Sequence, residues 1–162
     1  MTQLKVGDQA PAFTLKDQDG QTVSLADFRS RKLLLYFYPK ADTPGCTAQA
    51  CSVRDAMEPL ATSGVVAVGI SPDEPDRQKK FDQKYDLGFP LLSDPTHEVA
   101  QAYGAWGEKS MYGKTYHGIT RSSFLIDETG RILQVAYKVK PQDTVPRARQ
   151  ILESDTDPAV AT

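Results

Sequence analysis

The segment KLLLYFYPKADTPGCTAQAC, residues 32–51, joins a predicted strand to a predicted helix. It opens with a continuous apolar run that ends at Pro39, a pattern typical of a strand that is buried on both faces. A helix pattern follows over about residues 44–61, with an apolar stripe. The run GVVAVGIS, residues 64–71, predicts a second buried strand. The stripe of the helix consists of Ala48, Val53, Met57 and Leu60.

The rest of the chain continues this alternation. Residues 10–25 predict two short strands around an Asp-Gly turn, and Ser24 is the expected N-cap of a brief helix. These elements predict an α/β sandwich around a mixed sheet, with residues 1–154 as a single domain and 155–162 as a disordered tail. We further expect helices over 74–86, 97–105 and 144–153, strands within 89–94 and 122–139, and a long loop over 106–121.

Composition limits the classes of function. With 162 residues, of which 40% are hydrophobic and 25% charged, the chain is typical of one soluble domain with a sound core. A formal net charge of −2 gives no electrostatic case for binding nucleic acid or an anionic membrane. No apolar run approaches the ~20 residues of a membrane helix, and the first residues lack the apolar segment of a signal peptide. We therefore expect a cytoplasmic protein.

The two cysteines, Cys46 and Cys51, are the candidate reactive groups. In the cytoplasm thiols are kept reduced, so a catalytic disulfide is more plausible than a structural one. The cysteines and the two histidines, His97 and His117, are too scattered for the usual zinc spacings. We expect no metal and no cofactor.

Cys46 is predicted to lie in the first turn of the helix. Thr43 can serve as N-cap, Pro44 suits the first helical position, and Gly45 lets a neighbour or ligand come close to the backbone. Free N–H groups and the helix dipole favour an anion there, and thiols at such positions have pKa values well below the ordinary ~8.5. The alternative is that Cys46 is simply a small buried apolar residue.

The spacing of the two cysteines carries a geometric consequence. If both lie on one regular helix, their Cα atoms are ~8.7 Å apart and their side chains project about 140° apart. A disulfide needs Cα atoms within ~6.8 Å. A bond between Cys46 and Cys51 therefore requires the helix to unwind locally, and oxidation would act as a conformational switch. Arg121, at the start of a predicted strand, could supply a cation to the site, although a surface ion pair is the alternative.

The residues of this region resemble a known family. The pattern P-x-x-x-T-x-x-C, formed by Pro39, Thr43 and Cys46, is similar to the active-site signature of peroxiredoxins. The TPGCT segment with Cys-x4-Cys, the stretch YGAWGEKSMYGKTYHGITRSSFLID and the opening VGDQAPAFTL resemble the bacterioferritin comigratory protein or peroxiredoxin Q subfamily. The resemblance extends from about residue 4 to residue 153.

The resemblance implies a thioredoxin-like fold with an N-terminal β-hairpin extension and a thiol peroxidase activity. By this resemblance Cys46 is the peroxidatic cysteine, which becomes a sulfenic acid, and Cys51 is the resolving cysteine. The candidates for holding the hydroperoxide are Arg121, the hydroxyl of Thr43, and the backbone N–H groups of Gly45 and Cys46, while Pro39 would shield the thiolate. Thioredoxin or a similar dithiol would reduce the disulfide, and the subfamily leans toward monomers.

Other residues receive no chemical role at this point. Gln49 stands where some relatives have an acidic residue, and we attach little weight to it. Trp106, Tyr112 and Tyr116 match an aromatic loop of the family, and we expect them to pack beside the active site. His97 and His117 have no assigned chemistry. Two competing functions stay open. One is a disulfide oxidoreductase, disfavoured by the absence of CxxC, and the other is a redox sensor or holdase that signals through helix unwinding.

Overall fold

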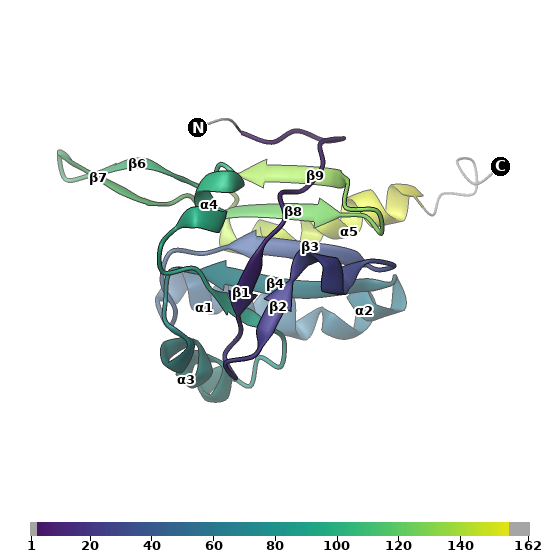
Figure 1. Cartoon of the computed structure of the whole chain (residues 1–162), viewed down its shortest axis with the longest axis horizontal. Coiled ribbons are helices and arrows are strands. Elements are labelled where there is room, and N and C mark those ends of the chain that lie inside the picture. The colour runs from purple at the N-terminus through teal and green to yellow at the C-terminus, as the bar shows by residue number, and fades with distance from the viewer. Residues whose placement is uncertain (1–2, 156–162) are drawn as a thin grey trace.

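The computed structural model describes residues 3–155 of the chain. Within them, seven strands form one sheet in the order β2-β1-β5-β4-β3-β8-β9, and β6 and β7 form a separate pair (Figure 1). The predicted tail, apart from residue 155, lies outside the described residues. The strands are β1 (Thr14–Lys16), β2 (Thr22–Ser24), β3 (Lys32–Phe37), β4 (Val65–Ser71), β5 (Leu91–Ser93), β6 (Trp106–Met111), β7 (Lys114–Ile119), β8 (Ser122–Ile126) and β9 (Ile132–Tyr137).

The sheet is mixed, as the sequence predicts. β3 pairs in parallel with β4 and antiparallel with β8, so it lies inside the sheet. β4 pairs in parallel with β5, and the N-terminal hairpin of β1 and β2 extends the sheet through the antiparallel pair Lys16 and Ser93. The predicted hairpin extension is therefore continuous with the main sheet. Ser24 precedes a short 3-10 helix, and its backbone N–H donates to Asp27 Oδ2 over 2.9 Å.

The apolar run of β3 is explained by its two buried faces. Leu34, Tyr36 and Tyr38 face one hydrophobic cluster, while Leu33, Leu35 and Phe37 face the other. Each fully buried large side chain contributes about 1.5–3 kcal/mol relative to exposure. Gly69 on β4 leaves room for the two tyrosines, because a Cβ there would lie 3.0 Å from Tyr36 Cζ and Oη and 3.0 Å from Tyr38 Cε1.

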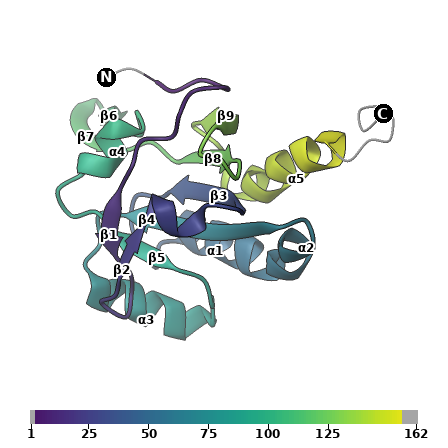
Figure 2. The same ribbon diagram turned by 45° about the vertical axis from the view of Figure 1, so that its right-hand side comes forward.

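Helices cover both faces of the sheet (Figure 2). The cluster that contains Tyr36 is covered by α1, α2, α3 and α5, and the opposite cluster by the 3-10 helix η1 and by α4. None of the helices within residues 3–155 is long and apolar enough to cross a membrane. The helices are η1 (Leu25–Phe28), α1 (Pro44–Asp55), α2 (Met57–Thr62), α3 (Pro75–Tyr85), α4 (Glu98–Ala102), η2 (Pro141–Asp143) and α5 (Thr144–Asp155).

The helix predicted over residues 44–61 is divided in two. α1 ends at Asp55, and Ala56, at φ −99° and ψ 0°, separates it from α2. Pro59 explains the break, because its ring clashes with the carbonyl of the residue four positions earlier and it has no N–H to donate. The predicted apolar stripe is also wrong at one position: Ala48 is exposed. The buried residues of α1 are Cys46, Gln49, Ala50 and Val53.

The loop predicted over residues 106–121 is instead a β-hairpin. β6 and β7 pair antiparallel, and the connection is Tyr112-Gly113, with φ values of 53° and 77°. Positive φ at both central residues is the signature of a two-residue type I′ turn, to which Gly113 is suited. The hairpin projects from the body of the molecule (Figure 1). Its base leads directly into Arg121 and β8.

Candidate active site

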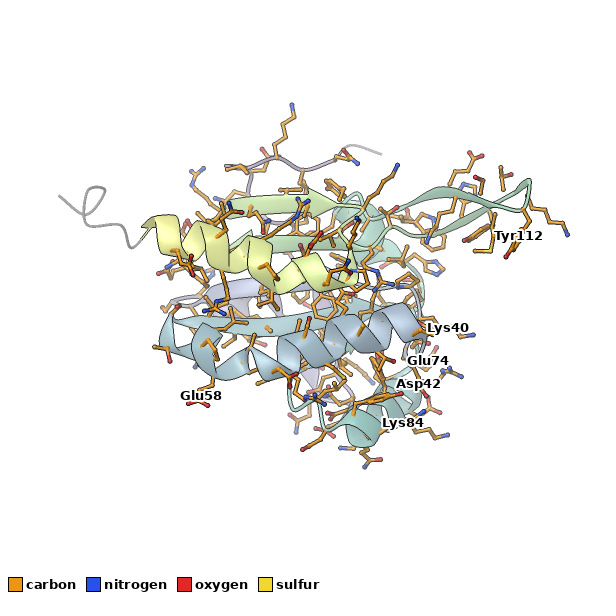
Figure 3. The ribbon with its side chains drawn as sticks, turned by 180° about the vertical axis from the view of Figure 1, so that it is seen from behind. Lys40, Asp42, Glu58, Glu74, Lys84 and Tyr112 are labelled. Atoms are coloured by element: carbon orange, nitrogen blue, oxygen red, sulfur yellow. The ribbon has the colours of Figure 1, made fainter. Side chains whose placement is uncertain are left out.

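Residues of α3 and of the segment between β4 and α3 hydrogen-bond to the loop between β3 and α1. The N–H of Ala41 donates to Asp73 Oδ2 over 2.7 Å. Asp42, at φ 61°, accepts from Lys84 Nζ over 2.9 Å and from the hydroxyl of Tyr85 over 2.9 Å. Figure 3 shows Asp42 and Lys84 together near the N-terminal end of α1. These contacts set the point at which the chain enters the helix.

The first turn of α1 presents unused backbone donors. Thr43 is the N-cap, as predicted, but its hydroxyl donates to the carbonyl of Lys40 over 2.8 Å and makes no bond to the helix. The first helical bond runs from Thr47 N–H to the Thr43 carbonyl over 2.8 Å. The N–H groups of Gly45 and Cys46 precede it and so have no acceptor within the helix. They are available to an anion or to an oxygen atom.

Both cysteines are free thiols on α1. Cys46 is buried, with 1% of its surface exposed, and Cys51 is half-buried. Because the two cysteines are five positions apart on one helix, their ideal Cα separation of ~8.7 Å exceeds the limit for a disulfide. Beneath Cys46 lie Tyr36 and Tyr38, and burial raises the pKa of both phenols well above the ordinary value, so both are neutral. The thiol therefore faces no anion from these two residues.

Arg121 lies against the same helix turn, as the sequence predicts. It stands between β7 and β8, where β8 pairs with β3. Its Nη2 would be 3.0 Å from a Cβ on Gly45, so the absence of a side chain at Gly45 lets the guanidinium reach the backbone of the first turn. Its Nη1 donates to Gln49 Oε1 over 2.6 Å. The predicted residues Cys46, Gly45 and Arg121 are thus brought together.

The partner of Arg121 is Gln49, for which no chemical role is expected from the sequence. Gln49 is fully buried, and its Nε2 donates to the hydroxyl of Thr144, at the start of α5, over 2.8 Å. The Gln49 amide, on α1, thereby positions the Arg121 guanidinium, and α5 positions the amide through Thr144. A signal was present in the sequence, because Gln49 follows Cys46 by three residues and so shares its helix face. No signal pointed to Thr144.

The aromatic residues of the hairpin differ in their surroundings. Trp106 stacks on His97, with ring centroids 3.8 Å apart, and His117 lies 6.5 Å from Trp106. Tyr112 is 96% exposed, so the expectation that it packs beside the site is wrong, whereas Tyr116, which is 42% exposed, pairs with Lys109 across the hairpin. Tyr112 occupies the tip of the projecting hairpin, far from α1 (Figure 3).

No group of three or more His, Cys, Asp or Glu side chains within residues 3–155 is placed to hold a metal ion. Pro39 lies two residues after the end of β3 and is partly buried. The site therefore consists of a buried thiol, a helix N-terminus and a guanidinium, an arrangement suited to stabilising a thiolate.

Comparisons with known proteins agree with this chemistry. The model of the AhpC/TSA family matches residues 6–135. The chain is 55% identical over 135 residues to the peroxiredoxin Bcp of Escherichia coli, covering 83% of this chain and 86% of the relative.

Solved structures extend the comparison to the fold. The chain superimposes on a cysteine-to-serine mutant of peroxiredoxin Q from Xylella fastidiosa with a TM-score of 0.90 at 27% identity, covering 97% of this chain and all of the other. A structure of the Xanthomonas campestris bacterioferritin comigratory protein, described for its alkyl peroxide reduction activity, gives a TM-score of 0.82 at 30% identity over 88% of this chain and 90% of that one. The chain has the thioredoxin-like fold of these proteins. It belongs to the AhpC/TSA family and, within it, to the Bcp or peroxiredoxin Q group of peroxiredoxins, which are thiol-dependent peroxidases.

Proposed function

We propose that Cys46 is the peroxidatic residue of this enzyme. The observation that carries the proposal is the convergence of a buried thiol, two backbone N–H groups without helical acceptors and the Arg121 guanidinium on one helix turn. The Cys46 thiolate attacks the terminal oxygen of a hydroperoxide, the O–O bond breaks, and the leaving alkoxide or hydroxide takes a proton. The products are the Cys46 sulfenic acid and an alcohol or water.

The surrounding donors are suited to the charge that moves in this step. Negative charge passes from sulfur to the peroxide oxygens, and donors already in place stabilise it most. Arg121 and the N–H groups of Gly45 and Cys46 are such donors. The Thr43 hydroxyl gives its hydrogen to Lys40, so it offers its lone pairs to the hydrogen of the bound peroxide. Pro39 shields the thiolate from water.

Cys51 resolves the sulfenic acid. Its thiol attacks the Cys46 sulfur, water leaves, and an intramolecular disulfide forms. Because the intact α1 holds the two residues too far apart, the first turns of α1 unwind during this step. A dithiol reductant such as thioredoxin then reduces the disulfide to two thiols and is itself oxidised to a disulfide.

The substrate class is hydrogen peroxide and alkyl hydroperoxides. The description of the Xanthomonas campestris relative supports the alkyl part, and the half-buried Cys51 beside an apolar cluster is compatible with it. A monomer suffices for this cycle, because both cysteines belong to one chain. The cytoplasmic location and the identity of the reductant stay predictions.

One experiment tests the cycle. The reduced protein is treated with one equivalent of hydrogen peroxide, digested without reductant, and mapped by mass spectrometry. We expect a Cys46–Cys51 disulfide, its disappearance after addition of thioredoxin, and no peroxide consumption by Cys46→Ser. Peroxide consumption by Cys46→Ser at the wild-type rate would overturn the assignment.

A further inference from the structure

Lys109 on β6 does not extend into solvent as a hairpin lysine normally would. Its Nζ donates to the carbonyl of Ile119 over 2.8 Å, and the side chain is half-buried. Ile119 is the last residue of β7, two positions before Arg121. The ammonium group is thus directed from the middle of the hairpin back toward its base, where the chain enters the active site.

The hairpin leaves room for the Lys109 side chain to run along its surface toward Ile119. Lys109 pairs with Tyr116 in the register of the two strands, so its side chain must pass Gly118 to reach Ile119. A Cβ on Gly118 would lie 3.2 Å from Lys109 Cδ. The space that a side chain at Gly118 would occupy is therefore filled by the methylene chain of Lys109.

The position brings two cations close together. Burial lowers the pKa of Lys109, the positive charge of Arg121 lowers it further, and Cys46 raises it. Within residues 3–155 neither Lys109 nor Arg121 forms an ion pair with a carboxylate. Arg121 instead contacts the neutral amide of Gln49. Two cations near each other repel, and an anion that lies close to both offsets this repulsion.

The other titratable groups around Cys46 do not supply that anion. Tyr36, on β3, and Tyr38, which directly follows β3, are buried and neutral. Asp73 accepts from the N–H of Ala41 and the hydroxyl of Ser71, on the β4 side of the loop. The remaining candidate is the thiolate of Cys46.

We propose that Lys109 is a second positive charge of the thiolate site, acting together with Arg121 to favour the Cys46 thiolate and the negative charge that develops on the peroxide oxygens. This proposal rests on the proposed function of Cys46. It makes the β6–β7 hairpin part of the catalytic apparatus, because the reactivity of the thiol depends on where the hairpin holds its lysine.

The test measures the thiolate without peroxide. In a Cys51→Ser background, the rate of Cys46 alkylation by iodoacetamide is followed from pH 4 to pH 9, because only the thiolate reacts. Lys109→Met, which keeps an unbranched chain as far as the ε carbon and removes the charged ammonium group, should move the midpoint of the profile to higher pH and slow alkylation below the midpoint by roughly fivefold. Lys109→Arg should restore the wild-type profile, and Lys114→Met, on the exposed part of the hairpin, should leave it unchanged.

Gly118→Ala provides a second variant, which displaces the lysine without removing it and should move the midpoint in the same direction by less. A wild-type profile in both Lys109→Met and Gly118→Ala would overturn the proposal. So would an equal shift in Lys109→Arg, because it would indicate a packing effect. If Lys109→Met shifts the alkylation profile but the protein with its native Lys109 and Cys46 consumes no peroxide, the charge effect is supported and the proposed function is refuted. Failure of this proposal and failure of the proposed function therefore give different results.

Discussion

Arg121 is held in the active site by Gln49, whose amide oxygen accepts from its guanidinium over 2.6 Å and whose amide nitrogen donates to Thr144 over 2.8 Å. The guanidinium is thus positioned by a neutral, fully buried side chain. An amide has both a donor and an acceptor, so a single residue connects α1 to the start of β8 and to α5.

The first prediction concerns this connection. Gln49→Met has a similar volume but makes neither hydrogen bond, so it leaves Arg121 unpositioned and the Thr144 hydroxyl buried without its partner. We expect kcat/KM for hydrogen peroxide to fall about tenfold or more and the free energy of unfolding to fall by about 1–3 kcal/mol. Steady-state kinetics and urea unfolding measure the two effects. Thr144→Val, which removes only the hydrogen bond between Gln49 and Thr144, should retain more activity than Gln49→Met. A wild-type kcat/KM in Gln49→Met would refute the positioning role of Gln49.

The second prediction concerns the close approach of Arg121 to Gly45. Gly45→Ala places a methyl group 3.0 Å from the original position of Nη2, so the guanidinium must move. Alanine also favours a helix over glycine by up to about 1 kcal/mol. We therefore expect lower peroxidase activity together with unchanged or higher thermal stability. Gly107→Ala, which meets no atom within 4 Å, is the control and should keep full activity. A fully active Gly45→Ala would show that the guanidinium position is not critical.

The third prediction separates the roles of the two cysteines. Cys51→Ser retains the buried Cys46 and its donors, so it should reduce one equivalent of peroxide at close to the wild-type rate. It should then stop, because the sulfenic acid has no resolving thiol and is oxidised further to sulfinic acid. Rapid-quench kinetics and intact mass spectrometry with thioredoxin present follow both events. Continued turnover would place resolution in another group.

The fourth prediction tests the unwinding of α1. Ala48 is an exposed residue of this helix, and glycine there weakens the helix by about 1 kcal/mol without removing a buried contact. We expect the disulfide to form from the sulfenic acid roughly fivefold faster, while the initial reaction with peroxide keeps its rate. Ala61→Gly, also exposed but on α2, should not accelerate resolution. Equal resolution rates in all three proteins would mean that unwinding does not limit the step.

The fifth prediction concerns the pH dependence of stability. Asp94 is buried, and burial raises the pKa of its carboxyl above 3.8 although Ala100 N–H donates to it over 2.9 Å. A carboxyl whose pKa is higher in the folded chain than in the unfolded chain stabilises the folded state most when it is protonated. This contribution to the free energy of unfolding is therefore lost as the pH rises through the pKa of the folded chain. Urea unfolding at pH 4 and pH 7 should show that the stability of wild type relative to Asp94→Asn decreases toward pH 7.

Asp127 is the matched control, with the opposite sign. Desolvation opposes the shift, but hydrogen bonds from Arg131 and Thr129 lower the pKa of Asp127 below 3.8. The contribution of Asp127 to the free energy of unfolding is present at pH values above the pKa of the unfolded chain, and it is lost as the pH falls through the pKa of the folded chain. The stability of wild type relative to Asp127→Asn should therefore increase from pH 4 to pH 7. The same trend in both variants would refute the assignment of the two shifts.

Much of the core was predictable because its signals are local. The alternation of β3 between two apolar clusters follows from an unbroken apolar run, and the position of Cys46 follows from the Thr43-Pro44-Gly45 helix start. The break at Ala56 was also predictable, since Pro59 cannot continue α1. The hairpin was missed because its strands are mostly exposed and lack the alternating pattern of a half-buried strand.

The supports of Arg121 were not predictable from local signals. Gln49 and Thr144 are 95 positions apart in the chain, and their contact depends on how α5 packs against α1. Lys109 likewise gains its position only when the hairpin register directs it past Gly118. Side chains that act through tertiary contacts carry no periodicity or capping pattern of their own.

Gly69 limits which substitutions the relatives of this chain can accept at positions 36, 38 and 69. Its missing side chain is the space into which both Tyr36 and Tyr38 extend, at 3.0 Å in each case. A lineage can acquire a side chain at position 69 only when the two aromatic rings shrink or turn away. We therefore expect these three positions to covary among relatives, and the aromatic floor beneath Cys46 to be inherited as a unit.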